Sequence, residues 1–135
     1  MLKILYLEDN DLDVLLLKRA LAEAKLEADV HAVTTCSEYQ KAIGHAQFDL
    51  ILSDAGLPGF SALEALDIAR RQCPKTPFIF LSGCTHETKI QSALAAGGTD
   101  YVVKGNNSHL AQAILRIQAG SARPSNLKPP ENRLS

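Results

Sequence analysis

Short apolar segments alternate along the chain with longer segments in which apolar residues recur every three or four positions. Several of the short segments are apolar almost throughout rather than at every second position. That pattern is typical of parallel strands covered by helices on both faces. The predicted strands are Leu2–Leu7, Ala28–Val33, Phe48–Ser53, Pro77–Ser82 and Asp100–Val103.

Apolar residues at helical spacing mark the segments between these strands. The four clearest sets are Val14, Leu17, Leu21 and Ala24; Ala62, Leu63, Leu66 and Ala69; Ile90, Ala93, Leu94 and Gly97; and Leu110, Ala113, Ile114 and Ile117. A weaker helix is expected over Cys36–Gly44, with Ser37 as its N-terminal cap and Gly44 as its stop. Five strands alternating with five helices predict the α/β class, with a parallel sheet and right-handed crossovers.

The length of 135 residues is sufficient for one domain with a proper core. A formal net charge of −1 gives no basis for binding nucleic acid or an acidic membrane surface, because both favour a basic excess. After Gly120 the helical pattern stops, and prolines become frequent. We therefore expect one domain over residues 1–120, followed by a flexible tail or the start of a linker over residues 121–135.

The apolar start of the chain is interrupted by Glu8 and Asp9. It is too short for the apolar region of a signal peptide and far too short to span a bilayer. The three cysteines have unrelated spacings and form no CxxC pair, so they indicate neither a zinc site nor a disulfide framework. These features predict a cytoplasmic protein with reduced thiols and no membrane partner.

Polar residues follow the predicted strands at the positions where an open parallel sheet binds its ligands. They are Glu8 and Asp9 after the first strand, Asp54 after the third, Ser82 at the end of the fourth and Lys104 after the fifth. Clustered carboxylates repel one another unless a cation neutralises them, and their oxygen atoms suit a hard ion such as Mg²⁺. One carboxylate of such a site can attack phosphorus, while a lysine and a hydroxyl bind the phosphoryl oxygens.

Each of these residues, taken alone, has an ordinary explanation. Acids at strand ends often lie in solvated turns, and Asp54 precedes the turn-forming segment Gly56–Gly59. Lys104 alone would be interpreted as a solvated surface charge. The site is favoured because all of them occur in the right order at the ends of successive strands.

Over about residues 2–119, this combination resembles the receiver domain of bacterial two-component response regulators, in particular the chemotaxis-regulator-like form. The resemblance is carried by the segments Leu5–Asn10, Leu50–Gly59, Phe80–Gly83 and Asp100–Gly105. It implies a flavodoxin-like three-layer sandwich with five helices, in which the five-stranded parallel sheet has the order 2-1-3-4-5.

The resemblance also implies which residues accept the phosphoryl group and hold the metal. Asp54 would take a phosphoryl group from a phosphohistidine on a sensor histidine kinase or a phosphotransfer protein. Mg²⁺ would be bound by Asp9, Asp54 and the backbone carbonyl of Gly56, while Glu8 would act mainly through a water molecule.

Three further residues are implied to carry the response. Ser82 would move to bond the phosphoryl group, and Lys104 would pair with it. Tyr101 would change rotamer and report phosphorylation on the face built from residues 85–119. That face would bind a downstream partner or a second copy of the chain, and no direct contact with nucleic acid is expected.

One position departs from the family pattern. Receiver domains usually have proline after the lysine, often through a cis peptide, whereas this chain has Gly105. A cis bond without proline costs about 3 kcal/mol. We therefore expect a trans peptide here, with Gly105 supplying unusual backbone dihedrals.

The expected function is a signalling switch that assists its own phosphorylation and dephosphorylation but is not otherwise an enzyme, and three other functions compete with it. A phosphohydrolase of the haloacid-dehalogenase type would carry its nucleophile after the first strand and would need a larger body. A flavodoxin would need hydroxyls and backbone amides in the first loop, which is acidic here. A degenerate receiver that only binds proteins is disfavoured by the intact set of acids, hydroxyl and lysine.

Overall fold

The computed structural model describes residues 1–55, 61–83, 91–92 and 94–120. The elements, in chain order, are β1 (Leu2–Leu7), α1 (Asp11–Glu23), β2 (Ala28–Val33), α2 (Cys36–His45), β3 (Leu50–Asp54), α3 (Ala62–Gln72), β4 (Phe78–Ser82), β5 (Asp100–Val103) and α5 (Asn107–Gln118). Three strands have the predicted bounds, β3 is shifted toward Asp54, and β4 begins one residue late. The predicted helix around Ile90–Gly97 falls partly outside the described residues, although residues 91–92 and 94–95 are helical. The predicted tail, 121–135, lies outside them altogether.

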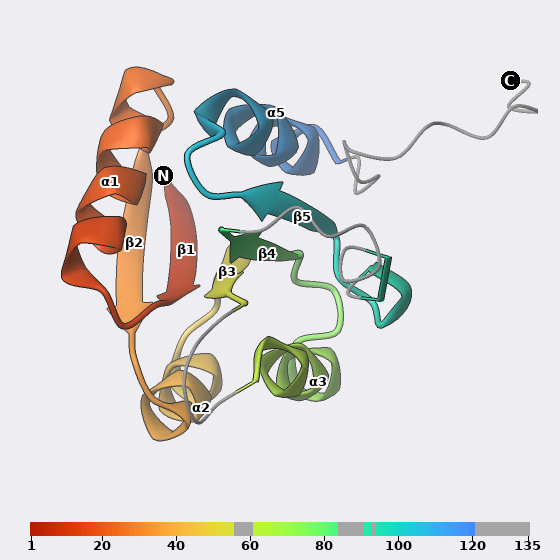
Figure 1. Ribbon diagram of the computed structural model, residues 1–135. Helices are drawn as coiled ribbons and strands as arrows, with labels where there is room; N and C mark the ends of the chain where they lie inside the picture. The colour runs from red at the N-terminus through yellow and green to blue at the C-terminus, as the bar shows by residue number, and fades with distance from the viewer. Residues whose placement is uncertain (56–60, 84–90, 93, 121–135) are drawn as a thin grey trace, which may run out of the picture.

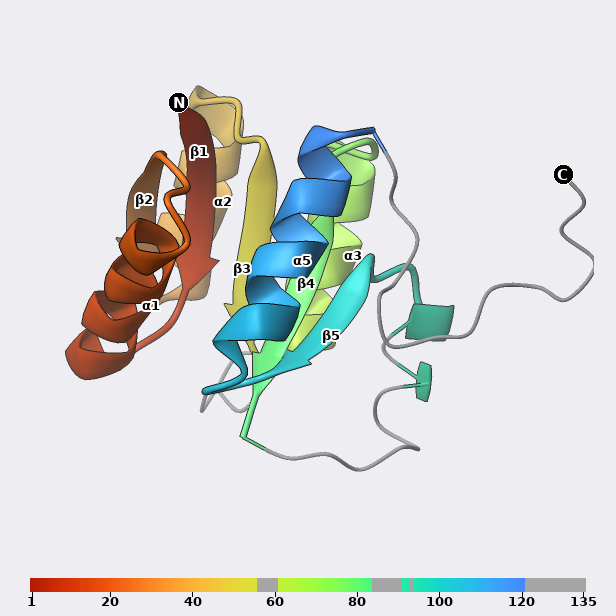
Figure 2. The same cartoon turned by 90° about the horizontal axis from the view of Figure 1, so that it is seen from above.

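The five strands form one parallel sheet with the order β2-β1-β3-β4-β5, as expected. Helices α1 and α5 cover one face, and α2 and α3 cover the other (Figures 1 and 2). The alternation of side chains along a strand explains the two layers of core. Ile4 and Tyr6 on β1 pack toward α1 and α5, while Leu5 and Leu7 pack toward α2 and α3.

The N-terminal caps fix where the helices begin. Asn10 caps α1 by accepting hydrogen bonds from the backbone N–H groups of Leu12 and Asp13. The expected cap of α2, Ser37, is wrong, because Thr35 caps this helix and forms a capping box with Glu38.

The expected end of α2 was also one residue early. The helix continues through Gly44 to His45, and Ala46 is its C-terminal cap. Nothing lies within 4 Å of the position where a Cβ atom of Gly44 would be, so the absence of a side chain there is not imposed by packing. Within the described residues, no helix is long and apolar enough to cross a membrane.

Candidate functional site

The carboxyl ends of the parallel strands bring four of the predicted site residues to one edge of the sheet. Asp54 is the last residue of β3, and Ser82 is the last residue of β4. The backbone N–H of Lys104 donates to the carbonyl of Ser82 at 2.7 Å, which fixes the exit of β5 beside the end of β4. Glu8 follows β1 and donates its backbone N–H to the carbonyl of Val33 at 3.0 Å.

Glu8 is the most deeply buried charged residue of this group, with 1% of its surface exposed. Its Oε1 accepts from the Tyr6 hydroxyl at 3.3 Å and from Lys104 Nζ at 2.7 Å. Its Oε2 accepts from the backbone N–H groups of Asp9 and Asn10 at 3.1 and 3.2 Å. Burial raises the pKa of Glu8, and the charge of Asp54 adds to that rise; the hydrogen bond from Lys104 opposes it without cancelling it.

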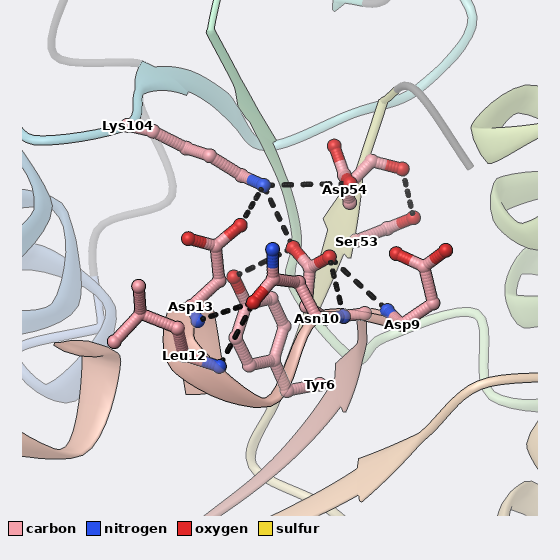
Figure 3. A network of polar contacts seen from close by, with 9 residues as sticks. Tyr6, Asp9, Asn10, Leu12, Asp13, Ser53, Asp54 and Lys104 are labelled. Carbon is pink, nitrogen blue, oxygen red and sulfur yellow. Dashed lines mark hydrogen bonds and ion pairs between the residues drawn. The ribbon is translucent and has the colours of Figure 1, made fainter. Parts of the chain in front are cut away.

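Lys104 is the positive centre of the site, and its ammonium contacts three carboxylates (Figure 3). Nζ lies 2.7 Å from Glu8 Oε1, 2.8 Å from Asp13 Oδ2 and 3.4 Å from Asp54 Oδ2. Burial alone would lower the pKa of Lys104. The hydrogen bonds to Asp13 and Glu8, together with the charge of Asp54, outweigh burial and hold the pKa above its usual range.

Asp13 and Tyr6 were not anticipated as members of this network. Asp13 lies in the first turn of α1, where an acid is ordinarily explained by its interaction with the helix dipole. Tyr6 lies within an apolar strand, so the sequence does not indicate that its hydroxyl has a polar partner. Burial raises the pKa of Tyr6, and the charges of Glu8 and Asp13 raise it further, so the hydroxyl stays protonated as a donor.

Three acids form a cluster that a cation could join. Glu8, Asp9 and Asp54 each offer one carboxylate oxygen, and these oxygens lie within 4.8 Å of one another. Asp9 is exposed, Asp54 is intermediate in burial and Glu8 is buried, so the cluster opens to solvent on the side of Asp9. A set of carboxylate oxygens fits Mg²⁺, which prefers oxygen ligands and keeps several waters. The predicted carbonyl ligand, Gly56, lies outside the described residues.

Tyr101 lies in the core on the α3 side of the sheet, with 3% of its surface exposed. Its ring stacks on that of Phe80, with centroids 6.1 Å apart and an interplanar angle of 29°. The ring of Tyr101 therefore points into the core in this structure, which is called its inward position below. The described part of the predicted 85–119 face comprises residues 91–92 and 94–119.

Gly105 has the unusual backbone expected of it. Its φ of 92° lies in the region that favours glycine, and its peptide bond with Lys104 is trans. No atom lies within 4 Å of an added Cβ at this position, so the requirement for glycine is conformational rather than steric. The turn leads directly into Asn106, which caps α5 by accepting from the backbone N–H of His109.

Comparison with known proteins agrees with this geometry. A family model described as the response regulator receiver domain matches residues 4–115. The chain belongs to the response regulator receiver domain family.

Curated relatives of this receiver domain include the transcriptional regulatory protein TcrA of Mycobacterium tuberculosis, which is 30% identical over 131 residues. That match covers 95% of this chain and 49% of TcrA. Hybrid signal transduction histidine kinase G of Dictyostelium discoideum is 28% identical over 106 residues, which make up 76% of this chain and 3% of the kinase. The chain thus spans about half or less of the length of these two relatives.

Solved structures resemble this receiver domain over most of its length. The chemotaxis response regulator CheY4 of Vibrio cholerae is 28% identical, with a TM-score of 0.73, over 87% of this chain and 98% of CheY4. The receiver domain of sensor histidine kinase PA1611 from Pseudomonas aeruginosa is 26% identical, with a TM-score of 0.72, over 89% of this chain and 98% of that domain. The PA1611 structure has a magnesium ion coordinated in its active site cleft.

Proposed function

We propose that this receiver domain accepts a phosphoryl group on Asp54 from a phosphohistidine of a sensor histidine kinase or a phosphotransfer protein. The observation that carries the proposal is the position of Asp54. Its carboxylate lies 3.4 Å from the Lys104 ammonium and belongs to the cluster formed with Glu8 and Asp9. With 15% of its side chain exposed, Asp54 is accessible from the edge of the sheet.

The transfer step conserves atoms and charge in a simple way. A carboxylate oxygen of Asp54 attacks the phosphorus atom, and the phosphorus–nitrogen bond of the phosphohistidine breaks. The electron pair of that bond returns to the imidazole nitrogen, which takes up a proton from solvent water. Lys104 and the Ser82 hydroxyl would bind the phosphoryl oxygens, where negative charge is concentrated.

Mg²⁺ is the cofactor that the donor set fits. We assign it to Asp9, Asp54 and the backbone carbonyl of Gly56. Glu8 would act through a water molecule, because its two oxygens already accept four hydrogen bonds from protein groups. When bound, Mg²⁺ would neutralise the clustered carboxylates and polarise the phosphoryl oxygens.

Phosphorylation would act as a switch rather than as a step in the turnover of a separate substrate. Movement of Ser82 toward the phosphoryl group would favour the inward ring of Tyr101, which already stacks on Phe80. The response would reach the face of residues 85–119, where we place the docking site of a downstream protein or a second copy of the chain.

Phosphoryl acceptance is tested with acetyl phosphate, a small donor that needs no partner protein. In the presence of Mg²⁺, the intact mass of the wild type should rise by one phosphoryl group. Asp54→Asn should abolish the rise, because an amide is not a usable nucleophile here. Asp67→Asn, which removes an exposed carboxylate of α3, is the matched control and should label like the wild type. Equal labelling of all three proteins would refute the assignment.

A further inference from the structure

The Lys104 ammonium forms ion pairs with three acids: Glu8 at the end of a strand, the proposed acceptor Asp54, and Asp13 on a helix. Of the three carboxylates, those of Glu8 and Asp13 lie 2.7 and 2.8 Å from Lys104 Nζ, and that of Asp54 lies 3.4 Å away. Asp13 comes from the first turn of α1, so this contact joins the helix to the turn after β5 (Figure 3). The proposed transfer to Asp54 does not use Asp13.

We propose that Asp13 is a positioning residue that holds Lys104 before phosphorylation and releases it when Asp54 carries a phosphoryl group. The inference rests on the proposed function of Asp54 as the acceptor. It adds that phosphorylation breaks one defined contact and thereby reaches the first turn of α1.

The burial of the two competing acids determines which one gives up the lysine. Glu8 is 1% exposed, and losing Lys104 would leave its charge buried beside the charge of Asp54, which is costly. The Asp13 side chain is 28% exposed, so water can hydrate it once Lys104 moves away. A phosphoryl group on Asp54 brings a charge of about −1.5 to −2. Lys104 is therefore expected to exchange Asp13, rather than Glu8, for a phosphoryl oxygen.

Hydrogen bonds link the first turn of α1 to Glu8, so we expect the exchange of partners by Lys104 to change the surroundings of this turn. The backbone N–H of Asp13 donates to the Asn10 side chain at 3.3 Å, and the backbone N–H of Asn10 donates to Glu8 at 3.2 Å. Asp13 and Lys104 also line a cavity of about 300 Å³ between α1 and the start of α5. Separating the two side chains would change one wall of this cavity.

The test compares two substitutions that each remove one negative charge from the same turn of α1. Asp13→Asn removes the partner of Lys104, and Asp11→Asn removes an exposed acid of the same turn. The phosphoryl mimic beryllofluoride is titrated with Mg²⁺ at fixed ionic strength. We expect Asp13→Asn to tighten the apparent Kd about fivefold, which is the lower end of typical coupling between sites. Asp11→Asn should stay near the wild type, and equal effects would overturn the inference, because they would show a general effect of charge.

A second measurement addresses the contact itself. In the Lys104→Met background, Asp13→Asn should no longer change beryllofluoride binding, because the lysine ammonium that Asp13 holds in the wild type is absent. Amide NMR of the wild type should show beryllofluoride-dependent shifts at Leu12 and Asp13 that Asp13→Asn lacks. Unchanged amide signals in this turn of the wild type would overturn the inference.

The outcomes separate this inference from the proposed function. A wild type that takes neither acetyl phosphate nor beryllofluoride would refute both proposals. A wild type that is labelled on Asp54, but responds equally to the two substitutions in α1, would leave the acceptor in place and refute only the role of Asp13.

Discussion

The ammonium of Lys104 lies 2.7 Å from a carboxylate oxygen of Glu8, although the two residues are 96 positions apart in the chain. The pair joins the ends of β1 and β5, which β3 and β4 separate in the sheet. The same ammonium also forms ion pairs with Asp13 and Asp54. Negative charge therefore remains in excess at this edge of the sheet, and that excess motivates the first prediction.

Mg²⁺ should stabilise the wild type against heat in a concentration-dependent way, because a ligand that binds only the folded state raises its stability. Asp9→Ala should lose most of the gain, since it removes an exposed member of the three-acid cluster. The measurement is the melting temperature across the millimolar range of Mg²⁺.

Asp11→Ala provides the matched control for Mg²⁺ binding. It removes an exposed acid two residues further along the chain that is not in the cluster, so it should retain the gain of the wild type. A melting temperature of the wild type that is indifferent to Mg²⁺ would count against a metal site.

Thr35 and Ser37 offer a test of the cap of α2. The Thr35 hydroxyl accepts the backbone N–H of Glu38 at 3.1 Å, so Thr35→Ala should lower the free energy of unfolding by about 1 kcal/mol. Ser37 lies inside the helix, where alanine has the higher helix propensity, so Ser37→Ala should be neutral or slightly stabilising. Urea unfolding of the two variants checks this prediction, and a larger loss for Ser37→Ala would contradict it.

The other half of the capping box should be visible in the pH dependence of stability. Hydrogen bonds from the backbone N–H and the hydroxyl of Thr34, with a further bond from Thr35, lower the pKa of Glu38. A carboxylate whose pKa is lowered by folding stabilises the fold above its unfolded pKa of about 4.3. That contribution is lost as the pH falls through the lower pKa of the folded state.

The stability difference between the wild type and Glu38→Gln should therefore be constant near neutral pH and shrink in acid. Glu64→Gln in the first turn of α3 is a control for the loss of an acid near a helix N-terminus. Urea unfolding over a series of pH values gives both differences. A difference for Glu38→Gln that persists unchanged in strong acid would rule out the carboxylate as its source.

The strands could be predicted from the sequence because their apolar runs are bounded by polar residues. Leu2–Leu7, for example, ends where Glu8 and Asp9 begin. The positions of Glu8, Asp54 and Lys104 at one edge followed from the parallel order of the strands. What could not be predicted was how the lysine is shared, because the geometry of Asp13 depends on how α1 packs against the turn after β5.

The cap of α2 was missed for a different reason. Thr35 and Ser37 are both hydroxyl residues near the start of the helix, and either one satisfies a preference for such residues at a cap. The deciding feature is Glu38, which lies three residues after Thr35 and whose side chain accepts a hydrogen bond from the backbone N–H of Thr35 at 3.3 Å. That spacing is present in the sequence and could have identified the cap.

The last prediction concerns the readout through Tyr101. Its ring is already inward and stacked on Phe80, so phosphorylation should retain the ring there rather than bring it in. We expect beryllofluoride to shift amide signals in β5 and α5 and to sharpen the ring signals of Tyr101, as its excursions become rarer. Tyr39, which is 0% exposed and whose hydroxyl donates to the backbone carbonyl of Ala65, serves as an internal control whose ring mobility should not change. Shifts that stay near Asp54 and never reach residues 85–119 would show that the face built from these residues is not the output.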